Sequence, residues 1–223
     1  MPSDHHGFVP SSAEDVLRAR VKVELRKRMR ALRKTLPSTA CAERSARIVE
    51  RLGSIEPVAR ARSIGLFWPI EDRHEVDLRP LDAALRARGV RVAYPGIDPD
   101  AGAMTFRFVV HPDRMEPQGF GFREPSLREP EVRPGELDAI VVPALAVDPR
   151  GHRIGYGAGY YDRTLPRFAP PAVSIAVAFD FQLVAEAPDT SLDVPVAWIV
   201  TDNRTLAVES GPAVAGSPAP EQG

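Results

Sequence analysis

The sequence has 223 residues, of which 29 are basic and 30 acidic, so its formal net charge is −1. A nearly neutral chain has no overall field that would draw it to nucleic acid or to an anionic membrane surface. The hydrophobic fraction of 43% and the charged fraction of 26% are those of a globular protein, and they exclude a wholly disordered, collagen-like or coiled-coil chain. This length favours one large domain over two small ones.

Cysteine usage and hydropathy indicate the compartment. The single cysteine, Cys41, excludes an intramolecular disulfide and indicates a reducing environment. The first residues contain no apolar run of signal-peptide length, and no later stretch approaches the roughly 18 apolar residues of a membrane span. We therefore expect a cytoplasmic protein that does not bind membranes.

Both ends of the chain have the composition of unstructured tails. Residues 1–12 are polar and without periodicity, and residues 209–223 consist of Gly, Pro, Ala, Ser, Val, Glu and Gln. Residues 13–208 are the predicted single domain.

Two helices open that domain. Apolar residues recur three to four positions apart from residue 13 to residue 35, which is the pattern of one helix face. The sequence Leu36-Pro37-Ser38 ends this helix. A second amphipathic segment runs from residue 38 to residue 52, with Ser38 or Thr39 as its N-cap.

The rest of the domain alternates strands and helices. Strands are predicted at 63–68, 90–94, 104–110, 138–143, 173–179 and 196–200, and helices at 77–88 and 158–168. A proline-rich irregular stretch covers 117–134, and a glycine-rich loop covers 151–159. This order predicts an α/β fold with a mixed, mostly parallel sheet flanked by helices on both faces. Ligands of such sheets bind outside the carboxyl ends of the strands.

The first helix is strongly basic. Between residues 18 and 34 there are nine basic residues and one acid, Glu24. Lys22, Arg26 and Arg30 are spaced by four, so their side chains lie along one strip beside the apolar face. This strip could bind phosphate groups, and a solvated helix face or an RNA-binding face are the alternatives that the pattern leaves open.

A glycine-rich stretch is the strongest chemical signal. It follows a predicted strand, runs into a predicted helix, and consists of Arg153, Ile154, Gly155, Tyr156, Gly157, Ala158, Gly159, Tyr160, Tyr161 and Asp162. Alternating glycines let main-chain N–H groups converge on an anion, and the start of the following helix adds to such a site. The stretch is neither a Walker A loop nor a dinucleotide fingerprint. We interpret it as a phosphate-binding loop, with a plain tight turn as the alternative.

Metal chemistry, if present, would depend on few residues. Asp162 lies where a bound nucleotide would need a hard oxygen ligand for Mg²⁺, and a capping aspartate is the alternative. The sequence shows no Ser-His-Asp, Cys-His or spaced His/Cys arrangement. Phosphoryl transfer requires no protein nucleophile, because its catalysis is mostly positioning and charge stabilisation.

Three separated motifs together resemble the 5-formyltetrahydrofolate cyclo-ligase family, also called the 5,10-methenyltetrahydrofolate synthetase family. Residues 22–26 are similar to its opening K-x-x-L-R, and residues 138–162 to its strand and glycine loop. Residues 176–201, which include Phe179, Gln182, Pro188 and Asp193, are similar to its closing segment. The resemblance spans roughly residues 22 to 208.

The resemblance implies an ATP- and Mg²⁺-dependent cytoplasmic enzyme that closes 5-formyltetrahydrofolate into 5,10-methenyltetrahydrofolate and releases ADP and phosphate. It implies a phosphorylated formyl group, an iminium phosphate, which N10 of the folate captures.

The resemblance also implies roles for individual residues. Lys22, Arg26 and Arg153 would be catalytic and hold ATP phosphates, together with Ile154, Gly155, Tyr156, Gly157, Ala158, Gly159, Tyr160 and Tyr161. Trp68 and Glu75 would contact folate, as would the loop from Tyr156 to Tyr160, and Glu71 is the alternative to Glu75. Asp162 and Asp193 would bind magnesium.

Two other functions remain open at this point. An ATP-using paralogue would act on a different small molecule, and an RNA-binding module would use the basic helix but leave the glycine loop without a role. We expect small-molecule substrates, no nucleic acid partner and a monomer.

Overall fold

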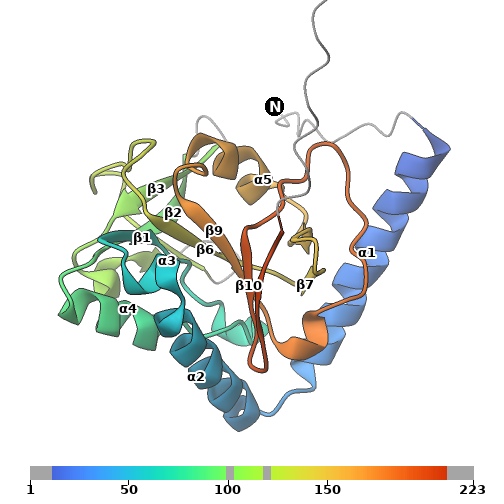
Figure 1. The fold of residues 1–223 in the computed structure, drawn as a ribbon, viewed down its shortest axis with the longest axis horizontal. Helices are drawn as coiled ribbons and strands as arrows, with labels where there is room; N and C mark the ends of the chain where they lie inside the picture. The colour runs from blue at the N-terminus through green and yellow to red at the C-terminus, as the bar shows by residue number, and fades with distance from the viewer. Residues whose placement is uncertain (1–11, 99–102, 118–121, 210–223) are drawn as a thin grey trace, which may run out of the picture.

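A computed structural model describes residues 12–98, 103–117 and 122–209 (Figure 1). The predicted tails therefore lie outside the described residues, except for Ser12 and Glu209. The α-helices are α1 (Ala13–Lys34), α2 (Ser38–Ser54), α3 (Glu56–Ala59), α4 (Arg79–Ala87) and α5 (Tyr160–Thr164). Short 3₁₀ turns cover η1 (Glu71–Arg73), η2 (Pro112–Arg114), η4 (Leu165–Arg167) and η5 (Asp180–Gln182).

A seven-stranded sheet forms the centre of the fold. Its strands lie in the order β11-β10-β9-β6-β1-β2-β3. Their bounds are β1 (Ser63–Gly65), β2 (Arg91–Asp98), β3 (Ala103–Phe108), β6 (Ala139–Pro143), β9 (Val173–Val177), β10 (Trp198–Val200) and β11 (Thr205–Ala207). The five inner strands are mutually parallel, and the two edge strands are antiparallel to their neighbours. The predicted α/β class with a mostly parallel sheet is confirmed.

Two small ribbons accompany the sheet. One pairs β4 (Glu116–Pro117) with β5 (Arg123–Glu124), and the other pairs β7 (Ala146–Val147) with β8 (Arg153–Ile154). The second ribbon matters for function because it leads from the end of β6 into the glycine-rich stretch.

The order of the strands places a topological switch point between β1 and β6. From β1 the chain crosses through α4 to β2 on one side, and from β6 it crosses through α5 to β9 on the other. Two parallel neighbours whose connections leave in opposite directions open a crevice at their carboxyl ends, which is where ligands of such sheets bind. The segments that follow β1 and β6 are therefore the first place to look for a site.

Alternation along the strands builds two cores, one on each face of the sheet. In β6, Ala139 and Val141 face the core beneath α2, α3 and α4, whereas Ile140 and Val142 face the core that contains Leu165 of η4. A strand buried on both faces reads as a continuous apolar run, as β6 does. Helical segments thus cover both faces, as predicted.

Helix α1 stands beyond β7, apart from the other helices (Figure 1). The Ser12 side chain accepts a hydrogen bond from the Asp15 main-chain N–H at 3.1 Å and caps the first turn. Leu25 and Met29 pack against a small third core that includes Ile154 of β8. No helix in the described ranges is long and apolar enough to cross a membrane.

Several predicted bounds differ from the structure. The strand predicted at 63–68 ends at Gly65, and the helix predicted at 158–168 is α5 followed by the 3₁₀ turn η4. The sequence did not predict α3, β11, the β7–β8 ribbon or the β4–β5 ribbon, of which β5 lies in the stretch predicted as irregular. These elements are short, and short segments carry little periodicity.

Candidate active site

The glycine loop leaves β8 at the carboxyl side of β6. The side chain of Asp148 closes the turn between β7 and β8 by accepting hydrogen bonds from the main-chain N–H groups of Arg150 and His152, each at 3.0 Å. Gly157 has φ +110°, and a Cβ there would lie 3.6 Å from the guanidinium of Arg26. A glycine is needed at this position because an L side chain rarely adopts that φ.

Helix α1 brings Arg26 to the main chain of the glycine loop. Arg26 Nε donates to the main-chain oxygen of Gly155 at 2.9 Å. Burial lowers the pKa of Arg26, and the charge of Arg30 lowers it further. Arg30 itself is exposed and bonds to the Arg26 main-chain oxygen. Of the strip of three predicted from the spacing, Arg26 reaches the loop, Lys22 reaches a carboxylate described next, and Arg30 does neither.

Lys22 forms an ion pair with Asp193 from a distant part of the chain. Its Nζ lies 2.5 Å from Asp193 Oδ2, and the two side chains are only 12% and 16% exposed. Burial by itself would raise the pKa of Asp193, but Lys22 and two hydrogen bonds from Thr190 outweigh it, so this pKa is lowered. The carboxylate is thus held in its charged form beside the helix.

A second ion pair joins Arg153 to Asp162 at 2.9 Å. Arg153 also donates to the Val194 main-chain oxygen at 2.5 Å, and Asp162 accepts from the Val194 N–H at 3.2 Å. Burial lowers the pKa of Arg153, while Asp162 acts in the opposite direction. Because Val194 follows Asp193, these bonds place the two predicted magnesium aspartates in one neighbourhood.

The donor set suits magnesium in one respect and resists it in another. Within the described ranges, no group of three or more His, Cys, Asp or Glu side chains is gathered to hold a metal. Mg²⁺ commonly uses one or two carboxylates and completes its octahedron with substrate phosphates and water, so a pair of aspartates fits it. Each aspartate is paired with a cation, however, so a metal must compete with Lys22 and Arg153.

On the other side of the loop, Glu75 lies beside Tyr156. Glu75 Oε1 accepts from the Tyr156 hydroxyl at 2.5 Å, and its Oε2 accepts from the Ile70 N–H at 2.9 Å. Glu75 is buried, whereas the side chain of Glu71 lies outside the described residues. Burial, followed by the charge of Glu75, raises the pKa of Tyr156. The structure therefore links the loop to Glu75, the carboxylate that was predicted to contact folate.

The remaining predicted residues occupy different surroundings. Trp68 is half-buried and meets Tyr94 edge to face, with ring centroids 5.9 Å apart. The Ile154 side chain is buried in the core beneath α1, so only its main chain can face a ligand. Tyr160 packs against the core on the α5 face, under the guanidinium of Arg163. Burial raises the pKa of Tyr161, and Ala158 is exposed.

Sequence reasoning missed Arg33 and Thr190. The guanidinium of Arg33 donates to the Tyr156 hydroxyl at 2.9 Å, and Thr190 holds Asp193 through its N–H and its hydroxyl. Arg33 was one of nine basic residues in the helix, and no feature of the spacing distinguished it from the rest.

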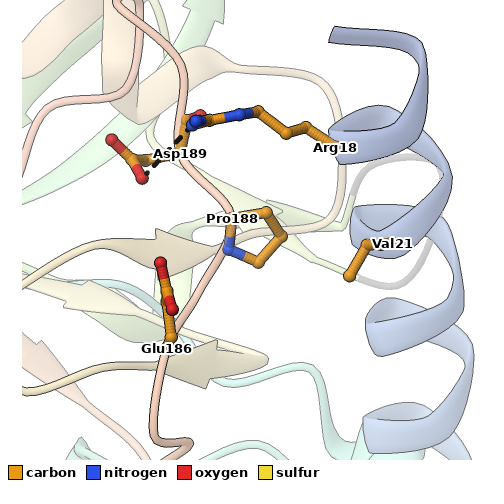
Figure 2. A pocket seen from close by; sticks show the side chains of 5 residues that line it. All are labelled: Arg18, Val21, Glu186, Pro188 and Asp189. Carbon is orange, nitrogen blue, oxygen red and sulfur yellow. Dashed lines mark hydrogen bonds and ion pairs between the residues drawn. The ribbon is translucent and has the colours of Figure 1, made fainter. Parts of the chain in front are cut away.

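A recess of about 300 Å³ lies between α1 and the segment 186–189 (Figure 2). It is lined by Arg18, Val21, Glu186, Pro188 and Asp189. Arg18 crosses it to the main-chain oxygen of Asp189 at 2.6 Å. Its lining residue Val21 directly precedes Lys22 on α1, so the recess adjoins the candidate site.

Fold and site together define an α/β protein with a glycine loop at the switch point of a parallel sheet. A basic helix places the cations Lys22 and Arg26 beside that loop and Asp193. The model of the 5-formyltetrahydrofolate cyclo-ligase family matches residues 18–202. The chain belongs to this family.

Individual relatives agree. The chain is 28% identical to the 5-formyltetrahydrofolate cyclo-ligase of Escherichia coli K12 over 179 residues, which is 79% of this chain and 97% of that protein. It is 39% identical to that of Mycolicibacterium smegmatis over 122 residues, or 53% of this chain and 63% of that protein. The solution structure of Aquifex aeolicus 5,10-methenyltetrahydrofolate synthetase matches with a TM-score of 0.74 at 29% identity, covering 87% of this chain and 96% of that one.

Proposed function

We propose that this enzyme uses ATP and Mg²⁺ to close 5-formyltetrahydrofolate into 5,10-methenyltetrahydrofolate, releasing ADP and phosphate. The observation that carries the proposal is the meeting of Lys22 and Arg26 with the glycine loop and Asp193, across up to 171 positions of sequence. Membership of the cyclo-ligase family supplies the reaction. The geometry supports a triphosphate site at this point, because it brings cations and loop N–H groups together.

In the proposed mechanism Lys22, Arg26 and Arg153 bind the phosphate oxygens, and the N–H groups of the loop add hydrogen bonds. Phosphoryl transfer gains most from such fixed positive charge, because negative charge spreads over the phosphate oxygens in the transition state. Lys22 would exchange Asp193 for phosphate. Asp162 and Asp193 would hold Mg²⁺, which would supply positive charge to offset part of the negative charge of the phosphates.

The chemical steps then occur on the substrate. The formyl oxygen attacks the γ-phosphorus, and ADP leaves with the electron pair of the broken P–O bond. N10 attacks the activated formyl carbon and loses its proton, and phosphate leaves with the oxygen. The product carries its positive charge across N5, the bridging carbon and N10. Capture by N10 is intramolecular, so holding the pterin still supplies much of the rate.

Trp68 and Glu75 are the proposed folate contacts. Both follow β1, on the other side of the switch point from the glycine loop. An indole can cover one face of the pterin ring, and a carboxylate can accept hydrogen bonds from its N–H groups. The formyl group would then lie between this pair and the phosphates.

The experiment is a spectrophotometric turnover assay with purified protein, 5-formyltetrahydrofolate, ATP and Mg²⁺. We expect the methenyl chromophore to appear with one phosphate released per product. The Lys22→Ala variant should lose about a hundredfold in kcat/KM for ATP, since it loses a charged contact to phosphate. Lys27→Ala, an exposed lysine of the same helix, is the matched control and should behave like the parent protein.

The assay also separates the alternatives. Nucleotide binding without any methenyl product would favour the paralogue that acts on another small molecule. The RNA-binding hypothesis is weakened by the positions of the basic side chains, because Lys22, Arg26 and Arg33 bond within the protein. It would be revived only by tight, salt-sensitive RNA binding that is lost on removal of residues 1–34.

A further inference from the structure

Arg33 is a buried cation at the last turn of α1. Its guanidinium donates from Nε to the Arg73 main-chain oxygen at 2.9 Å, and a second bond to the same oxygen comes from a terminal nitrogen. That terminal nitrogen also donates to the Tyr156 hydroxyl at 2.9 Å and lies 3.8 Å from Glu75 Oε1. The side chains of Arg33 and Glu75 are only 4% and 3% exposed. Such burial excludes a solvated-face role for this member of the basic run.

The main chain of Arg33 holds the same loop. Its carbonyl oxygen lies 3.0 Å from His74 Nδ1, and a carbonyl can only accept, so Nδ1 carries the hydrogen. His74 has φ +48°, a left-handed conformation that is uncommon outside glycine. Arg33, at the end of α1, thus holds residues 73–75 through both its side chain and its carbonyl group.

The hydroxyl of Tyr156 connects Arg33 to the glycine loop. Arginine can only donate, so Arg33 uses a lone pair of the hydroxyl oxygen, and the single hydroxyl proton points to Glu75. Charge-assisted bonds of this kind are stronger and more directional than neutral ones. The arrangement fixes the direction of every proton between Arg33, Tyr156 and Glu75.

We propose that Arg33 is a positioning residue of the reaction, which acts through the Tyr156 hydroxyl to hold the Glu75 carboxylate and the glycine loop in one geometry. A single buried cation then fixes the positions of both Glu75, which is proposed to contact folate, and the glycine loop, which is proposed to bind nucleotide. Binding of one ligand therefore helps to order the site of the other. In this role Arg33 acts on the ligands through Tyr156 and touches neither phosphate nor folate itself. This inference rests on the proposed function, since it assigns Glu75 to folate.

The test compares three variants by steady-state kinetics and by calorimetric titration with a non-hydrolysable ATP analogue. Tyr156→Phe removes one hydroxyl and keeps the ring, Arg33→Met removes the cation, and the double variant removes both. For Tyr156→Phe we expect KM for 5-formyltetrahydrofolate to rise about tenfold, the loss of one hydrogen bond to a charged group. Folate should tighten nucleotide binding in the parent protein and fail to do so in this variant.

The double variant gives a second readout. If both residues act through one hydrogen-bonded chain, its KM should be no higher than that of Arg33→Met alone. Arg28→Met removes an exposed arginine from the same helix and is the matched control. Variants that only lower the melting temperature, with unchanged KM and unchanged coupling, would overturn the inference while the parent's turnover upholds the proposed function. A parent protein without turnover would remove both.

Discussion

Asp193 is the residue on which the charge balance of the site depends most directly. Its carboxylate accepts from Lys22 at 2.5 Å and from the Thr190 N–H at 2.6 Å, and it is largely shielded from water. Removing its charge leaves the Lys22 ammonium partly buried without a counter-ion. Breaking one side of such a pair costs more than the pair contributes, because the remaining charge stays desolvated.

Asp193→Asn should therefore destabilise the protein by about 1–3 kcal/mol at neutral pH. The folded-state pKa of Asp193 is lowered. The contribution of its carboxylate to the free energy of unfolding is therefore complete above the unfolded-state pKa of about 3.9, and it is lost as the pH falls through the folded-state pKa. The difference in unfolding free energy between parent and variant should stay constant from pH 8 to about 5 and shrink below about 4.

Urea unfolding of both proteins across this range is the measurement. Asp113→Asn, at an exposed aspartate of η2, is the matched control and should shift the unfolding free energy by less than about 0.5 kcal/mol at any pH. A gap between parent and Asp193→Asn that widens on acidification would contradict the assignment of Lys22 as its partner.

The same scale shows what a sequence reveals about a site. The glycine loop was predicted from its own chemistry, because three glycines before a helix indicate an anion site wherever they occur. The assignment of Lys22 and Asp193 to one site came only from the family resemblance. Arg33 escaped prediction because its partners Arg73 and Tyr156 lie 40 and 123 positions away, and helical periodicity says nothing about contacts between elements.

At the scale of elements, the β7–β8 ribbon is what places the glycine loop. Its turn packs against the segment that leads into β10, with the Val196 N–H donating to the Gly151 main-chain oxygen at 3.0 Å. Gly151 has φ +86°, and a Cβ there would lie 2.5 Å from the Val196 main-chain oxygen. Both the backbone conformation and the space therefore require glycine.

Gly151→Ala should cost about 3 kcal/mol of stability, the sum of a strained φ and a clash with main chain that cannot move away. The matched control is Gly53→Ala in α2, where a Cβ would meet no atom within 4 Å. This substitution should stabilise the helix by about 0.5–1 kcal/mol. Urea unfolding of the two variants should thus give shifts of opposite sign. Equal shifts would mean that the turn does not pack on Val196 as described.

Elements were predicted well where their pattern was long and poorly where it was short. The twenty-two residues of α1 have a clear period, and the helix ends at Lys34, shortly before Pro37. The strand after residue 63 was predicted too long, because Leu66 and Phe67 are buried like strand residues although they lie beyond the end of β1. An apolar run reports burial, and burial continues where the chain turns away from its neighbours.

At the scale of the whole molecule, the candidate site is built by segments that meet only in the folded chain. Lys22 and Arg26 come from α1, Glu75 from the connection after β1, the glycine loop from the connection after β6, and Asp193 from the approach to β10. Neither α1 nor the loops could hold this geometry alone. Ligand binding should therefore stabilise distant parts of the sequence together.

Amide hydrogen exchange measured with and without a non-hydrolysable ATP analogue and Mg²⁺ tests this. We expect slower exchange on binding in residues 18–30, 153–161 and 188–194 at once, because a ligand that binds only the assembled site suppresses the openings that separate its parts. Helix α4 lies far from α1 in Figure 1 and packs on the face of the sheet opposite to η4, so its exchange should remain unchanged. Protection confined to residues 153–161, with α1 exchanging as before, would show that the basic helix does not take part in nucleotide binding.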